Sequence, residues 1–120
     1  MTNYEIFVNF EDVINFLEKV AEFEEKGAEK EDKIGAKVYK NTAEGIRKMI
    51  KKLKERFKDK EWVSKKELLW QMKIIGRWEA GDDPILNIRL TEALTNLLID
   101  FMIIGKIRVK VKFERKGNKK

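Results

Sequence analysis

The sequence of 120 residues predicts an α+β fold that is mainly helical, and two observations support this prediction. Through most of the chain, apolar residues recur at spacings of three and four, which is the period of an amphipathic helix. Towards the C-terminal end the period becomes two, because Ile107, Val109, Val111 and Phe113 alternate with charged residues. That alternation is typical of a half-buried strand, here with one basic face. The length corresponds to about one ordinary domain.

The composition excludes several classes of protein. Cysteine and histidine are both absent, which excludes disulfides, thiolate and imidazole metal ligands and a Ser-His-Asp triad. We therefore expect a non-enzymatic protein without cofactor or metal and without an evident small-molecule substrate. No apolar run reaches the roughly 18 to 20 residues of a membrane span, and the first residues lack a signal-peptide pattern, so we expect a cytoplasmic protein that contacts no membrane. Abundant Lys and Glu with a single Gln are typical of a thermophile.

The charge is distributed unevenly along the chain. Residues 1–36 hold 4 Lys and 10 acidic residues, whereas residues 37–120 hold 23 basic and 11 acidic residues, so that a net −6 is followed by a net +12. Two segments, 46–66 and 106–120, each carry a net +7. This asymmetry predicts an acidic N-terminal helical extension over 1–36 and a basic domain over 37–120, and it favours a polyanionic partner.

The first third predicts one helix and one loop. Asn9 is an N-cap type of residue, and the helix that follows it is expected to end near Gly27. Residues 4–8 fit either a short strand or an irregular lead-in. Residues 27–36 are polar and contain two glycines, which predicts a loop.

The second helix is expected to be amphipathic and basic. Residues 37–40 are too few to assign, and Thr42 is the expected N-cap. An apolar stripe follows for about four turns, and Lys and Arg residues, among them Arg47 and Lys48, cover much of the remaining surface.

Two more helices are expected before the final strand. Residues Ser64–Glu67 match the Ser-x-x-Glu capping box and open a helix that should end around Gly76. After a loop over 77–83, the last helix starts either at Asp83-Pro84 or at Thr91 and ends at Gly105. Residues 91–104 contain no Lys or Arg and are apolar nearly all round, which predicts burial on every side, in the core or at a subunit interface.

This order of elements resembles the winged helix-turn-helix superfamily over residues 42–115. The resemblance is carried by the pair Trp62-Val63, the Ser64–Glu67 box, the apolar helix 91–104 and the strand 106–113. It implies a winged-helix-like domain that binds DNA and regulates transcription. A wing needs two strands, and the partner of strand 106–113 is open among Trp62-Val63, Tyr4–Val8 and a strand of a second subunit.

We expect nucleic acid, with duplex DNA favoured over RNA, to be bound mainly through phosphates. Base reading needs Arg, Lys, Asn or Gln on the exposed N-terminal half of the recognition helix, and residues 91–104 are poor in them. The alternatives are solvated lysine faces and an edge strand protected by Lys. The predicted phosphate contacts come from Arg47, Lys48, Lys51, Lys52, Lys54, Lys65, Lys66, Arg108, Lys110 and Lys112, extended by the tail residues Arg115, Lys116, Lys119 and Lys120.

The competing interpretation is a protein-interaction module, such as a homodimer, within a larger assembly. Its candidate interface residues are Trp70, Leu97 and Phe101. Trp70 lies off the apolar face of its predicted helix, where it would either anchor a partner or pack as an ordinary core or surface residue.

Overall fold

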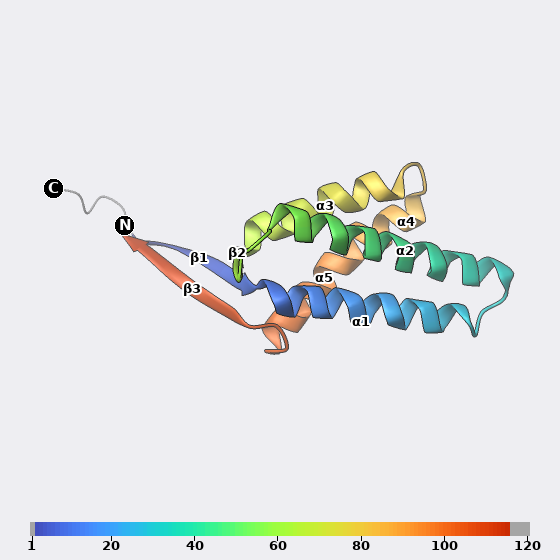
Figure 1. The fold of residues 1–120 in the computed structure, drawn as a ribbon, viewed down its shortest axis with the longest axis horizontal. Coiled ribbons are helices and arrows are strands. Elements are labelled where there is room, and N and C mark those ends of the chain that lie inside the picture. The colour runs from blue at the N-terminus through green and yellow to red at the C-terminus, as the bar shows by residue number, and fades with distance from the viewer. Residues whose placement is uncertain (1, 116–120) are drawn as a thin grey trace.

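A computed structural model describes residues 2–115 and shows an α+β fold that is mainly helical, as the sequence predicts (Figure 1). Two long helices form an antiparallel hairpin, further helices pack against it, and two strands extend beyond the helices as a ribbon. The elements in order are β1 (Thr2–Asn9), α1 (Phe10–Ala28), α2 (Lys33–Arg56), β2 (Trp62–Ser64), α3 (Lys65–Ala80), α4 (Pro84–Ile88), the π-helical segment η1 (Arg89–Ala93), α5 (Leu94–Ile103) and β3 (Val109–Arg115).

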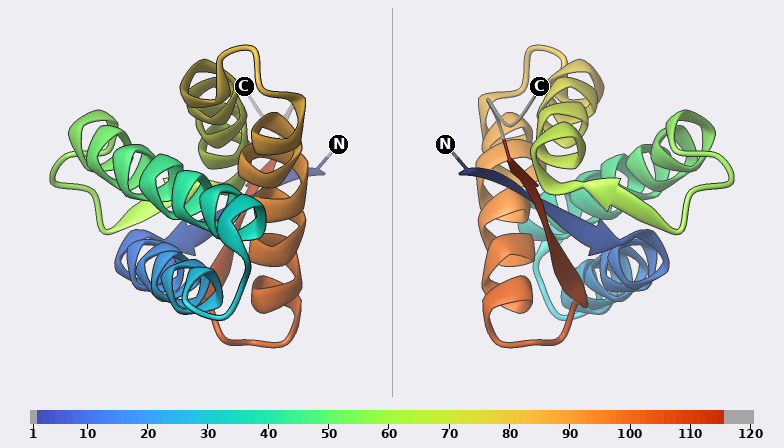
Figure 2. Two further views of the ribbon diagram at one scale, coloured as in Figure 1. Left: turned by 90° about the vertical axis from the view of Figure 1, so that its right-hand side faces the viewer. Right: turned by 90° about the vertical axis from the view of Figure 1, so that its left-hand side faces the viewer.

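The strands form one antiparallel sheet in the order β2-β1-β3. Val8 of β1 pairs with Val63 of β2 on one side and with Val109 of β3 on the other. Of the three partners considered for the C-terminal strand, the N-terminal segment is therefore the one found. We call the paired strands β1 and β3 the ribbon; seen end-on, it lies in front of the helices (Figure 2, right).

The second helix begins ten residues earlier than predicted. Asp32, not Thr42, is the N-cap, and its carboxylate accepts a hydrogen bond of 2.9 Å from the backbone N–H of Gly35. Thr42 lies inside α2, where its hydroxyl donates to the carbonyl of Val38. The predicted loop over 27–36 thus shrinks to the turn between Ala28 and Lys33.

The third helix extends past its predicted end. Gly76 lies inside α3 and does not end it. Glycine is needed there because the helix passes close to another backbone: a Cβ at this position would be 2.8 Å from the carbonyl oxygen of Leu90. The final helical run starts at Asp83-Pro84, where the Asp83 carboxylate caps the first turn. The alternative start, Thr91, falls within η1. The predicted end is confirmed, since Gly105 follows α5 with a φ of 81°.

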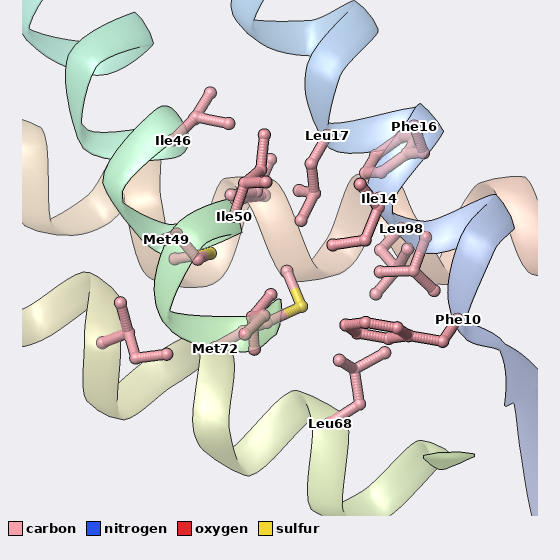
Figure 3. Close-up of a cluster of buried hydrophobic side chains, with 14 of the residues drawn as sticks. Phe10, Ile14, Phe16, Leu17, Ile46, Met49, Ile50, Leu68, Met72 and Leu98 are labelled. Carbon is pink, nitrogen blue, oxygen red and sulfur yellow. The ribbon is translucent and has the colours of Figure 1, made fainter. Parts of the chain in front are cut away.

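A single core joins the first third of the chain to the rest. It contains Val13 of α1, which is fully buried. Leu17 of α1, Met49 of α2, Leu68 of α3 and Leu98 of α5 belong to the same core and are also fully buried (Figure 3). The boundary predicted after residue 36 falls within α2, and β1 is the middle strand of the sheet. Residues 1–36 are therefore not separated from the others in the core or in the sheet.

The last helical run is buried on one side only. Leu94, Thr95 and Leu98 are buried, but Ile103 and Ile104 are exposed, so residues 2–115 do not provide the burial that was expected on every side. Among the described residues, no helix is long and apolar enough to span a membrane.

Candidate nucleic-acid interface

The ribbon has one apolar and one charged face. Because side chains alternate along a strand, the pairing register places Lys110 and Lys112 of β3 on the same face as Phe7 and Glu5 of β1. The opposite face carries Tyr4, Ile6, Val109, Val111 and Phe113, and most of these side chains are exposed.

The charged face is organised by contacts to β2. The ammonium of Lys110 lies 4.5 Å from the centroid of the Trp62 ring, within range of a cation–π interaction. Lys112 lies directly opposite Glu5, and the Glu5 carboxylate accepts a hydrogen bond of 2.8 Å from the Ser64 hydroxyl. The ribbon is thereby tied to the start of α3.

A shallow depression of about 510 Å³ lies between the sheet and α3. It is lined by Glu5 and Ser64 on the sheet side and by Lys66, Glu67, Leu69, Trp70 and Lys73 on α3. Trp70 is 62% exposed. We call Lys66, Trp70, Lys73, Lys110 and Lys112 the ribbon–α3 surface.

Lys73 was not among the sequence-predicted site residues. The signal that reveals it is its spacing of seven from Lys66, which is two helical turns and places both lysines on one side of α3. Lys65, in contrast, is half-buried at the first position of the helix.

Four of the residues predicted to contact phosphates form ion pairs with carboxylates of the same chain. Arg47 pairs with Glu25 of α1 at 2.8 Å, and Lys52 pairs with Glu79 of α3 at 3.0 Å. Lys48 lies within 4 Å of carboxylate oxygens of both Glu44 and Glu79, and Arg108 pairs with Asp12.

The pair of Arg108 and Asp12 is bidentate and anchors the start of β3 on the start of α1. The guanidinium donates through Nε and Nη2 to the two carboxylate oxygens at 2.8 and 3.0 Å, and the backbone N–H of Arg108 also donates to Asp12. These hydrogen bonds lower the pKa of the Asp12 carboxyl, against a smaller opposing effect of burial. Asn9, the cap of α1, accepts a further bond from Arg108.

The pair of Arg47 and Glu25 connects α2 to α1 in the same bidentate manner. Hydrogen bonding to Arg47 lowers the pKa of Glu25. The acidic residues of α1 thus neutralise part of the basic surface of α2. Lys51 and Lys54 are exposed, and no ion pair of theirs is found among residues 2–115.

The predicted interface residues do not form one patch. Trp70 lines the depression beside the ribbon, whereas Leu97 and Phe101 line a different cavity between α1 and α5. Phe101 is half-buried and packs on Phe16 with ring centroids 4.9 Å apart. The predicted tail contacts Lys116, Lys119 and Lys120 lie outside the described residues.

Comparison with protein-family models, with curated proteins and with solved structures found no match for this chain.

Proposed function

We propose that this protein binds nucleic acid, with duplex DNA as the expected partner, through phosphate contacts from the ribbon–α3 surface. The observation that carries the proposal is the position of Lys110 and Lys112, which lie together on one face of a ribbon that extends beyond the helices. Lys66 and Lys73 add two cations on α3, around a depression that Glu5 of the ribbon and Glu67 also line. Cations on a protruding ribbon can approach a phosphate backbone without obstruction from the rest of the molecule.

The arrangement favours binding without sequence specificity. Specific readout needs hydrogen-bonding side chains on an element that enters a groove. Ile85, Ile88 and Ile103 are exposed along α4 and α5, and residues 90–104 contain no Lys or Arg. Phosphate contacts position a protein on the duplex but carry no base information.

Charge reversal on the ribbon tests the proposal. Each phosphate contact contributes about 0.9 to the slope of log affinity against log salt, so Lys110→Glu combined with Lys112→Glu is expected to weaken binding and reduce that slope by about 2. Fluorescence anisotropy of labelled duplex DNA at about 50 and 200 mM salt measures both quantities. Circular dichroism checks that the variant is folded.

The matched control is Lys30→Glu combined with Lys33→Glu. These residues lie at the turn between α1 and α2, at the opposite end of the molecule from the ribbon (Figure 1). The control makes the same change in net charge, so its salt slope should stay at the native value. An equal loss in both variants would show that net charge alone attracts DNA, and would contradict an interface on the ribbon.

A second candidate function is self-association through the apolar face of the ribbon. Phe113 is 70% exposed on this face, and its ring lies beside that of Tyr4, with centroids 6.4 Å apart. Two-stranded ribbons are marginally stable alone in water, so a second copy covering this face would stabilise it. Sedimentation equilibrium would then show a dimer that Val111→Glu dissociates; a monomer at all concentrations contradicts this candidate.

A further inference from the structure

The cavity between α1 and α5 has the size and the lining of a small-molecule site. Its volume is about 650 Å³, within the range of about 300 to 1,000 Å³ that is typical of ligand pockets. Its apolar walls come from α1, α5 and the turn before β3, and they consist of Phe16, Val20, Phe23, Leu97, Phe101 and Ile107.

The walls combine rigid and adaptable parts. Phe16 and Ile107 are buried in the core, and the packing of Phe16 on Phe101 fixes the floor. Phe23 also lines the cavity and is 71% exposed. The cavity thus offers a packed floor and an open entrance.

The rim of the cavity carries an excess of available positive charge. Four charged residues line it, namely Asp12, Lys19, Glu24 and Lys106. Both carboxylates are already engaged, since Asp12 pairs with Arg108 and Glu24 pairs with Arg89 of η1. No ion pair of Lys19 or Lys106 is found within the part of the chain that the structure describes.

We propose that this cavity binds an amphiphilic carboxylate, with the hydrocarbon part against the apolar walls and the carboxylate beside Lys19 and Lys106. Burial of hydrocarbon supplies most of the affinity. The two lysines select an anionic headgroup over a neutral or cationic one. This site is independent of the ribbon–α3 surface, so its test does not depend on nucleic-acid binding.

The test compares decanoate with decanol, which has the same chain length and a neutral headgroup. Isothermal titration calorimetry below the critical micelle concentration gives the two affinities. We expect decanoate to bind about tenfold more tightly, which corresponds to about 1.4 kcal/mol, because each exposed charge pair contributes only modestly. Lys19→Gln combined with Lys106→Gln should remove that preference, and Lys30→Gln combined with Lys33→Gln is the matched control.

Chemical-shift mapping locates the ligand, and a filled cavity provides the second variant. Decanoate should shift amide resonances of α1, α5 and residue 107, and Leu97→Trp should abolish binding while leaving the fold intact. Three results would overturn the proposal: equal affinity for decanoate and decanol, shifts confined to the ribbon, or a dimer that Leu97→Trp dissociates. The last result would mean that a second copy of the chain covers the cavity.

Discussion

Asp12 shows how one side chain joins two distant parts of the molecule. Its carboxylate accepts hydrogen bonds from the guanidinium and the backbone N–H of Arg108, 96 residues further on. It also lies in the first turn of α1, where negative charge interacts favourably with the helix dipole. The start of β3 is thus fixed by a group that belongs to the first helix.

The lowered pKa of Asp12 predicts a pH-dependent contribution to stability. An unfolded aspartate titrates near pH 3.9, and the folded pKa lies below the ordinary value. The contribution of the ion pair is therefore complete above about pH 5 and is lost as the pH falls through the lowered pKa. Asp12→Asn should lower the free energy of unfolding at pH 7, and the difference from the native protein should shrink below about pH 4.

Urea unfolding at several pH values between 3 and 7 measures this difference. The control is Glu55→Gln, which removes an exposed carboxylate of α2 without touching the anchor of β3. If the free energy of unfolding of Asp12→Asn stays below that of the native protein by the same amount down to pH 3, the charge of Asp12 contributes no stability of its own.

The π-helical segment η1 determines how the last three helices fit together. Leu90 of η1 is fully buried between α2 and α3, and a glycine faces it from each. A Cβ on Gly45 would lie 2.6 Å from a methyl group of Leu90, and a Cβ on Gly76 would lie 2.8 Å from its carbonyl oxygen. The methyl group belongs to a side chain that is able to move, whereas the carbonyl belongs to the backbone.

Gly76→Ala is therefore expected to destabilise the protein more than Gly45→Ala. Overpacking in a core costs about 1 to 3 kcal/mol, while replacing glycine by alanine inside a helix returns up to about 1 kcal/mol. We expect a net loss of about 1 to 2 kcal/mol for Gly76→Ala and a smaller loss for Gly45→Ala, measured by urea unfolding. A Gly76→Ala variant as stable as the native protein would mean that α3 and η1 separate without cost.

The helices could be predicted from the sequence where periodicity and capping agree, and not where glycine has a packing role. The box that starts at Ser64 marks the start of α3, and Gly105 marks the end of α5. Gly76, however, looks like a helix end although it provides space for Leu90. Gly27, in contrast, lies one residue before the last residue of α1, so the helix end predicted near it is confirmed.

The candidate site was partly predictable for a related reason. The period of two places Lys110 and Lys112 on one face of a strand whichever strand they pair with. The ion pairs that engage Arg47 and Arg108 join residues 22 and 96 positions apart, and no local pattern reveals such partners. The role of β1 depends in the same way on distant pairing with β3.

At the scale of the whole molecule, the charge boundary after residue 36 is not a boundary of the core. A fragment of residues 37–120 would lack β1, α1 and the start of α2. It would lose Val8, Val13, Leu17 and Ala21 from the core, all of which are fully buried. We expect this fragment to remain unfolded, with poorly dispersed amide resonances and no cooperative urea transition, in contrast to the full chain.

A cooperative transition of the fragment would instead support the predicted division into an extension and a basic domain. In that case residues 1–36 would only raise the stability of a fold that residues 37–120 form by themselves. Without a cooperative transition, the core needs the whole chain. With one, the first third only covers a core that the rest of the chain forms.

The middle position of β1 also has a consequence for the order of events during protein synthesis. Val109 follows its partner Val8 by 101 residues, so a growing chain carries β1 long before β3 leaves the ribosome. Helices α1 to α5 can form in the interval, but the edge of β1 that pairs with β3 keeps its backbone N–H and C=O groups unpaired until β3 arrives. Exposed strands of this kind are prone to aggregate. A translational pause placed just before β3 would therefore prolong the most vulnerable stage in the production of this protein.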